Sequence, residues 1–342
     1  MPAFPLAALP VALLVSYAVM PLVVRLAWAT GYLDHPEARK LHTSATALLG
    51  GAAVFAVALA TWGAAMAFMP HSPSDWEAYY LLFGAGGALA LGLWDDRFGM
   101  SPSIQLLGQA AAATMIVAGG AVPEIGLPAG VEGILALVAL VALMNAVNFL
   151  DNMNGMVGGL AAIALLGFAW TSLARGANGV AAAQLALGGA CLGFLPHNFP
   201  RARLFLGDAG SLLLGYSLGA SALLAMQGAP PGWGQAGPVI MLAYPAFDLI
   251  FVVVTRLRDG RPVQQGGKDH SNHRLASVLK CPIRTVLVIW VSGVVLCAGG
   301  IATLRLNSPI PTLLLSVPLT ILLFWSGLRL SSVPIARPSP PK

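Results

Sequence analysis

The sequence predicts an all-α integral membrane protein with about eleven transmembrane helices. Of its 342 residues, 57% are hydrophobic and only 9% are charged, and the mean hydropathy is +0.79. Soluble domains carry about 25% charged residues, and a soluble fold of this length could not bury so much apolar surface in one core. The apolar runs have helical length and lack the alternating segments of a membrane β-barrel, which favours helices.

Each expected span is long enough to cross roughly 30 Å of hydrocarbon. The spans are expected at residues 4–26, 46–69, 77–95, 104–121, 131–150, 156–174, 179–197, 209–227, 236–256, 284–304 and 309–331. Clusters of Pro and Gly, as at Met69-Pro70 and Ser308-Pro309, punctuate the gaps between them. We expect residues 1–333 to form a single polytopic transmembrane domain and the proline-rich residues 334–342 to be a disordered tail.

The distribution of positive charge predicts the orientation. With the N-terminus outside, 16 of the 18 Lys and Arg residues fall on the inner side, and only Arg175 and Arg305 fall on the outer side. Positively charged loops stay in the cytoplasm, so we expect an outside N-terminus, a cytoplasmic C-terminus and an odd number of spans. The net charge of +5 reports this orientation and does not indicate nucleic acid as a partner.

Four polar clusters then lie on the cytoplasmic side, each at the end of an expected helix. They are residues 94–97, 145–155, 207–211 and 268–274. Ionisable groups at membrane-helix ends are costly, and this makes them functional candidates by default. Their convergence on one face predicts a site there.

The first cluster holds Asp95 and Asp96. Neighbouring residues on a helix point about 100° apart, so both carboxylates cannot face one ligand equally. One could face a metal or an attacking group while the other is hydrogen-bonded into the bundle. The alternative is a solvated interfacial pair that is neutralised by Arg97.

The second cluster places Asn145, Asn148 and Asn152 in one stripe at i, i+3 and i+7. The stripe could bind a sugar or a nucleotide; the alternative is hydrogen bonding between helices, which amides in bundles often provide. Asp151 lies off the stripe, and we expect it to mark the helix end before a turn at Asn154-Gly155.

The third cluster, residues 207–211, precedes a long apolar helix. Asp208 or Ser211 could cap that helix, and a helix N-terminus favours phosphate. A carboxylate beside the phosphate can hold Mg²⁺, so Asp208 is the candidate metal ligand. The alternative is a plain N-cap with a glycine turn.

The fourth cluster lies in the longest inner loop, about 257–283. Lys268, His270, His273 and Arg274 form a cationic surface suited to a pyrophosphate or a nucleotide; the alternative is a solvated, positively charged loop.

Asp248 lies deeper in the expected ninth span, roughly 12 Å before Arg256 at 1.5 Å per residue. Burying a carboxylate there costs about 2.5–3.5 kcal/mol, so it needs a partner, for which we expect an arginine at the cytoplasmic helix end. A purely structural ion pair is the alternative to a binding role.

Together the clusters offer carboxylates for Mg²⁺, cations and a helix end for phosphates, and amides for a sugar or base. That set suits phosphoryl transfer, in which catalysis is mainly positioning and neutralisation of charge. A site at the membrane surface also implies a lipid substrate. The competing class is an ion-coupled secondary transporter, whose site would lie near the midplane, where only Asp248 fits.

These motifs resemble those of the polyprenyl-phosphate N-acetylhexosamine-1-phosphate transferases. This glycosyltransferase-4-like family includes phospho-N-acetylmuramoyl-pentapeptide transferase and UDP-GlcNAc:undecaprenyl-phosphate GlcNAc-1-phosphate transferase. The resemblance spans nearly the whole chain. Its motifs are residues 34–36, 39–42, 50–51, 95–96, 145–155, 207–211, 245–248, 267–270 and 273–274.

The resemblance implies that undecaprenyl phosphate attacks the β-phosphorus of a UDP-N-acetylhexosamine, giving lipid-pyrophosphoryl-sugar and UMP. It implies Mg²⁺, for which Mn²⁺ can substitute, and a multi-pass enzyme of the bacterial inner membrane that starts a cell-envelope glycan such as O-antigen. A homodimer is also expected.

By position, Asp208 resembles the family's metal ligand, and Asp151 is a further candidate ligand. Asp95, Asp96 and Asp151 resemble catalytic acids, and His270 with its neighbours resembles the loop that contacts pyrophosphate and helps to set sugar choice.

Three departures from the family pattern stand out. Ile104-Gln105 occupies the stretch where relatives carry a basic residue, and Asn154 stands where they carry a second aspartate. The histidine loop lacks the three-histidine run of the peptidoglycan enzyme. The sequence therefore favours UDP-GlcNAc or a modified hexosamine as donor, with UDP-MurNAc-pentapeptide as the alternative.

Overall fold

The computed structural model of the chain describes residues 3–34, 45–70, 72, 75–263 and 267–333. The expected tail 334–342 and most of the motif at 34–42 lie outside these residues. The long helices are α1 (Ala3–Thr30), α2 (Gly50–Phe68), α3 (Asp75–Phe98), α4 (Pro102–Ala118), α5 (Ala129–Leu150), α6 (Met156–Ala174), α7 (Asn178–Asn198), α8 (Gly207–Gln227), α12 (Pro282–Leu306) and α13 (Pro309–Ser331). Shorter elements are β1 (Leu33–Asp34), β2 (Thr46–Ala47), η1 (Trp233–Gln235), α9 (Ala236–Met241), α10 (Ala243–Arg258) and α11 (Ser271–Leu279).

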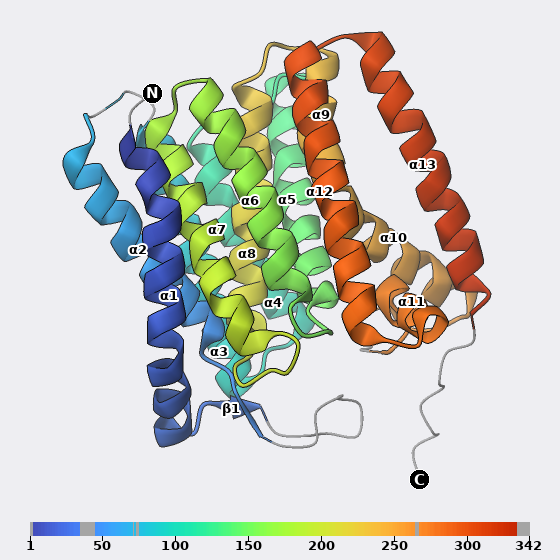
Figure 1. Cartoon of the computed structure of the whole chain (residues 1–342). Helices are drawn as coiled ribbons and strands as arrows, with labels where there is room; N and C mark the ends of the chain where they lie inside the picture. Colours follow the sequence, from blue (N-terminus) through green and yellow to red (C-terminus); the bar gives the residue numbers. More distant parts are fainter. Residues whose placement is uncertain (1–2, 35–44, 71, 73–74, 264–266, 334–342) are drawn as a thin grey trace.

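The helices run roughly alongside one another as a single bundle (Figure 1). Eight of the described helices are long and apolar enough to cross a membrane, or nine if one bent pair counts as a span. This confirms an all-α, multi-pass fold class. Neither α3, which has charged residues at both ends, nor the shorter α4 is among the eight, so the count of eleven and the direction of the termini stay predictions.

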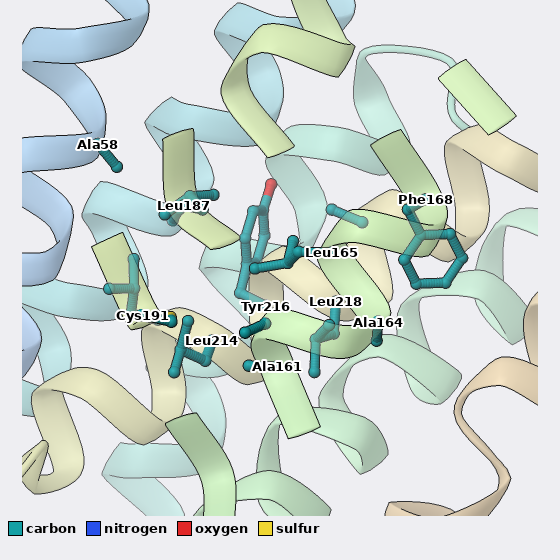
Figure 2. Packing of buried hydrophobic residues seen from close by; sticks show 14 of the residues in the cluster. Ala58, Ala161, Ala164, Leu165, Phe168, Leu187, Cys191, Leu214, Tyr216 and Leu218 are labelled. Atoms are coloured by element: carbon teal, nitrogen blue, oxygen red, sulfur yellow. The ribbon is translucent and has the colours of Figure 1, made fainter. Parts of the chain in front are cut away.

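Burial divides the bundle into an inner and an outer set of helices. In the apolar stretch of α8, 89% of the residues are buried, against 22% for α1 and 0% for α13. Tyr216 of α8 packs among side chains such as Leu165 of α6 and Leu187 of α7 (Figure 2). Because α8 is central, its N-terminus lies in the middle of one end of the bundle.

That end carries all four polar clusters, and we call it the polar face. It contains the ends of α3, α5 and α10, the start of α8, and residues 267–274 beside α11 (lower end in Figure 1). The short strands lie there too: β1 pairs antiparallel with β2, and Ala47 of β2 forms a parallel bridge with Leu204. The first helix begins at the opposite end, so the described chain starts and finishes on different faces.

A continuous helix at 236–256 was the wrong prediction. The segment is two helices, α9 and α10, which meet at a 70° bend around Leu242. Pro245 explains the break, because it has no N–H to donate to the Met241 carbonyl four residues earlier. The inner loop predicted at 257–283 also contains a helix, α11.

Candidate active site

The N-terminus of α8 is capped by a carboxylate from another helix. Asp96 of α3 accepts hydrogen bonds from the backbone N–H groups of Asp208, at 2.8 Å, and of Ala209, at 3.1 Å. The residue at the N-cap position, Leu206, supplies no side-chain bond. The expectation that Asp208 or Ser211 caps this helix is therefore wrong, and these N–H groups are occupied by Asp96 rather than open to a phosphate.

Two glycines allow this close arrangement of α3 and α8. Gly207 has φ +72°, and a Cβ there would lie 2.5 Å from the Asp96 carboxylate. A Cβ on Gly92 would lie 2.4 Å from the Asp208 carbonyl oxygen. Larger side chains at either position would push the carboxylate and the helix end apart.

Asp208 projects from this first turn toward the end of α5. The side-chain amide of Asn148 donates to Asp208 Oδ1 at 2.9 Å and lies 3.2 Å from Ser211 Oγ. Asp151 follows directly after α5, as the sequence predicts, and its carboxylate accepts no hydrogen bond from the residues that the structure describes. Burial and the negative charge of Asp208 raise the pKa of Asp151 to about 7.

This pair of acids fits a magnesium ion that also binds phosphate. Among the described residues, no three His, Cys, Asp or Glu side chains are grouped as a complete metal site. Mg²⁺ nevertheless is commonly held by one or two carboxylates, with substrate phosphates and water completing its shell. Asp151 and Asp208 satisfy that requirement, whereas both Asp96 oxygens accept backbone hydrogen bonds.

Asp95 faces α4, away from Asp96. Its Oδ2 accepts a hydrogen bond from Gln105 Nε2 at 2.6 Å. One turn along α4, the buried Gln109 pairs with the amide of Asn145 on α5. From the sequence, Gln105 was noted only as a departure from the family pattern and Gln109 was missed, although their i, i+4 spacing on an otherwise apolar helix was the available signal.

The asparagine stripe contacts three different helices. Asn145 binds α4 through Gln109, Asn148 binds α8 through Asp208, and Asn152 accepts a bond at 2.7 Å from Asn272 of α11. These are the interhelical hydrogen bonds that were the alternative to a binding role. The three amides hold the ends of α4, α8 and α11 around the end of α5.

The N-terminus of α11 repeats the capping arrangement of α8. Asp248 of α10 is fully buried and accepts bonds from Ser271 N at 2.8 Å and Ser271 Oγ at 2.6 Å. Its second oxygen lies 2.8 Å from His270 Nδ1. The bend between α9 and α10 brings Asp248 against His270 and Ser271, so it belongs with the segment of residues 267–274, which we call the histidine region.

Arg256, the expected partner of Asp248, binds Asp269 instead. Its guanidinium makes two bonds to the Asp269 carboxylate, at 2.9 and 2.8 Å, and Arg261 adds a contact at 2.9 Å. Burial raises the pKa of Asp269, but the bonds and charge of Arg256 with the charge of Arg261 outweigh it and lower the pKa to about 2. The carboxylate is therefore ionised and fixed at neutral pH.

The remaining basic residues of this region differ in exposure. Lys268 is exposed, and His273 is partly buried, with burial and the nearby His270 lowering its pKa to about 4. Arg274 is buried and donates to the carbonyls of Leu330, Ser331 and Val333. Arg274 thus joins this region to the end of α13, and its guanidinium faces carbonyls rather than an open surface.

Comparison with known proteins fits this arrangement. A probable undecaprenyl-phosphate N-acetylglucosaminyl 1-phosphate transferase of Bacillus subtilis is 30% identical over 300 residues, covering 85% of this chain and 82% of that protein. The model of glycosyl transferase family 4 matches residues 78–226. The chain belongs to this family.

Two further relatives align with the chain to different extents. A decaprenyl-phosphate N-acetylglucosaminephosphotransferase of Mycolicibacterium smegmatis is 29% identical, with 86% of this chain and 80% of that protein aligned. A phospho-N-acetylmuramoyl-pentapeptide-transferase of Desulforudis audaxviator is 34% identical, but only over 42% of this chain and 41% of that protein. The family resemblance seen in the motifs is confirmed.

Two of the positions that depart from the family pattern, Gln105 and Asn154, have defined contacts. Gln105 holds Asp95, as described above. Asn154 donates its side-chain amide to the Pro200 carbonyl at 3.1 Å, and the next residue, Gly155, donates its N–H to Asn198. A carboxylate at position 154 could not donate that bond, so Asn154 fastens the Asp151 loop to the segment before α8.

Proposed function

We propose that the protein transfers GlcNAc-1-phosphate from UDP-GlcNAc to undecaprenyl phosphate, releasing UMP. The observation that carries this proposal is the meeting of Asp208, Asp151 and Asn148 at the N-terminus of α8 on the polar face of a membrane bundle. The proposal also follows the names of the relatives that align over 85% and 86% of the chain. The pentapeptide transferase aligns over 42%, which favours GlcNAc over the pentapeptide donor.

In the proposed reaction, a phosphate oxygen of the lipid attacks the β-phosphorus of the donor. The bond between that phosphorus and the bridging oxygen breaks, and UMP leaves with the bridging oxygen and its electron pair. A new phosphoanhydride forms between the lipid phosphate and GlcNAc-1-phosphate. One anhydride replaces another, so the protein's task is to position two anionic substrates and offset their charge.

Asp208 and Asp151 would hold Mg²⁺, with Mn²⁺ able to replace it. When bound, the ion offsets the charge of the donor's pyrophosphate. Asn148 fixes the Asp208 carboxylate for this role through its bond at 2.9 Å. Asp96 then contributes indirectly: by capping α8 it sets where Asp208 lies.

Asp95 would orient the lipid phosphate or accept its proton. It lies partly buried at the end of α3 and is held by Gln105. Replacing Asp95 by Asn should lower kcat more than it weakens UDP-GlcNAc binding, because its task concerns the lipid phosphate. Unchanged turnover with weaker donor binding would contradict this role.

The histidine region would bind the donor. His270 is held through Nδ1 by Asp248, which leaves Nε2 for a phosphate or sugar oxygen. Lys268 and His273 lie beside it as further substrate contacts. Asn152, held by Asn272, and Arg274, held by α13, position this region, and Asn145 positions α5 against α4.

We further propose that residues 1–333 are one catalytic domain of the bacterial inner membrane, acting as a homodimer to start a cell-envelope glycan. The polar face would lie in the cytoplasm, as the bias of Lys and Arg predicts. Lys268→Cys in a Cys281→Ser background tests this, because Cys191 and Cys297 are buried. Labelling of whole cells by a membrane-impermeant maleimide would contradict the orientation; labelling only in inverted vesicles is expected.

The reaction itself is tested by UMP release from the purified protein. Undecaprenyl phosphate, Mg²⁺ and a panel of UDP-sugars are supplied, with EDTA-treated samples as the control. We expect release with UDP-GlcNAc and none with UDP-glucose, which lacks the acetamido group. No release with any UDP-N-acetylhexosamine would refute the proposal.

A further inference from the structure

A recess apart from the candidate active site lies at the same end of the molecule, beside α1. Its volume is about 300 Å³, and it lies between α1, the end of α7 and the segment that leads into α8. Its lining residues are Tyr17, Pro196, His197, Phe199, Pro200, Arg201 and Arg203. None of the acids or histidines assigned to the reaction above lines it.

The recess is positively charged. Arg201 and Arg203 are both exposed, and neither forms a salt bridge within the part of the chain that the structure describes. No acidic side chain is among the lining residues. Two guanidinium groups at one recess suit a phosphate, which accepts several N–H bonds in the geometry that arginine offers.

A proline in α1 allows a side-chain contact between α1 and α7 at the recess. Pro21 lies inside α1 and has no N–H, so the carbonyl of Tyr17 lacks the usual helix bond. His197 Nε2 lies 3.1 Å from that carbonyl and donates to it, and the rings of Tyr17 and His197 are 5.2 Å apart. These contacts fix the recess at the junction of the two helices.

The recess is also continuous with an apolar, unburied surface. Leu14 of α1 is 64% exposed and Tyr17 is 53% exposed, and residues three apart share one helix face. Only 22% of the apolar stretch of α1 is buried, so an α1 that crosses the membrane would expose this face to hydrocarbon. Tyrosine is typical of the boundary between hydrocarbon and headgroups.

We propose that this recess binds an anionic phospholipid. The headgroup phosphate binds Arg201 and Arg203, and an acyl chain lies along the exposed face of α1 at Leu14 and Tyr17. The combination selects a lipid over a soluble phosphate compound, because a soluble compound would leave the apolar face uncovered. Pro200, which accepts the bond from Asn154, lines the recess, so the bound lipid adjoins the segment that fastens the Asp151 loop.

The test is lipid binding to the delipidated protein in detergent, measured by native mass spectrometry without any UDP-sugar. Phosphatidylglycerol is compared with phosphatidylcholine for the wild type and for Arg201→Gln/Arg203→Gln. Each arginine near an anionic lipid contributes about fivefold, so the double variant should bind phosphatidylglycerol about twenty-fivefold more weakly. Phosphatidylcholine binding should weaken much less, because its quaternary ammonium offsets the charge of its phosphate.

The matched control is Arg258→Gln/Arg284→Gln, which removes two exposed arginines from the same end of the bundle but outside the recess. Equal losses in both double variants would overturn the proposal, as would equal wild-type affinity for the two lipids. Displacement of phosphatidylglycerol by millimolar inorganic phosphate would instead indicate a small-anion site and would also overturn it. Because no UDP-sugar is present, these outcomes do not depend on the proposed reaction.

Discussion

The starts of α8 and α11 are alike in how they are capped but differ in the charge of the side chains around them. Each helix lacks a cap from its own side chain, and each receives a carboxylate from a different helix: Asp96 of α3 or Asp248 of α10. Around α8, a second and a third acid, Asp208 and Asp151, lie close by. Around α11, the neighbouring side chains are His270 and Asp269, and the charge of Asp269 is offset by Arg256 and Arg261.

The difference shows that the same kind of helix cap can stand beside a cation site or beside an anion site. In both places the positive helix end is already neutralised by a protein carboxylate, so neither helix end is the phosphate site. The side chains added around each cap set the preference: acids at α8 favour a cation, and imidazoles and cations at α11 favour an anion. A donor with a pyrophosphate needs both.

The largest effect should come from Asp208→Asn. Removing the carboxylate that holds the cation should lower kcat for UMP release about 10³-fold while leaving the thermal unfolding midpoint in detergent near the wild-type value. Asp208→Glu is the control that keeps the charge and should retain measurable, Mg²⁺-dependent turnover. Wild-type activity in Asp208→Asn would contradict the cation-binding role of the α8 end.

Asp269→Asn should destabilise the α11 side by about 3–5 kcal/mol, because it leaves the buried Arg256 without its partner. Arg261→Gln is the matched control, since Arg261 contacts the same carboxylate but is 24% exposed, and it should cost less than about 1 kcal/mol. Thermal unfolding in detergent measures both. Equal losses of stability in the two variants would mean that the buried pair of Arg256 and Asp269 does not stabilise the α11 side.

The same ion pair predicts how stability depends on acid. The pKa of Asp269 is about 2 in the folded protein and about 3.8 ordinarily, so the folded state binds fewer protons than the unfolded state between these values. Its contribution to stability is complete above about pH 4 and is lost as the pH falls toward 2. Unfolding of Asp269→Asn should therefore change less over this range than unfolding of the wild type.

Asp96→Ala and Asp248→Ala test the comparison directly. Each removes a helix cap, and each should reduce the free energy of unfolding by about 0.5–2 kcal/mol, with Asp248 toward the upper end because it is fully buried. Hydrogen exchange should increase at the first turn of α8 in one variant and of α11 in the other. Loss of turnover without either change would instead make Asp96 a directly catalytic acid.

Asn154→Asp should have the smallest effect. It should reduce the free energy of unfolding by about 0.5–1.5 kcal/mol, because one hydrogen bond to the Pro200 carbonyl is lost. Asn154→Ala loses the same donor and should lower kcat to a similar extent. If Asn154→Asp is as active as the wild type while Asn154→Ala is not, the position needs an acceptor rather than a donor.

Sequence alone predicted the class of fold and the position of several acids at helix ends. Composition required a helical membrane bundle, and α5 ends at Leu150 with Asp151 next, as the turn residues indicated. Asp95 and Asp96 diverge as neighbours on a helix must, one toward Gln105 and the other toward α8. These features depend on local helix geometry, and for this reason they can be predicted from a sequence pattern.

The partners could not be predicted, because they depend on how helices are placed in space. Asp248 was expected to bind an arginine on its own helix, but the bend at Leu242 places it beside Ser271 and His270. In the same way, the sequence does not indicate that Asp96 caps α8, because that contact depends on how closely α8 approaches α3. The charge pattern identified which groups need partners, and tertiary contacts determined which partners they have.

The attachment of Arg274 to α13 has a consequence for biogenesis. Apart from this contact, α13 lies at the margin of the bundle with none of its apolar stretch buried. The carbonyls of Leu330 and Ser331 at its end, and of Val333 just after it, are nevertheless acceptors for the buried guanidinium of Arg274, which also binds the Asp269 carbonyl. During synthesis these carbonyls emerge from the ribosome after every other described part of the polar face. The histidine region can therefore reach its final form only once α13 has been inserted.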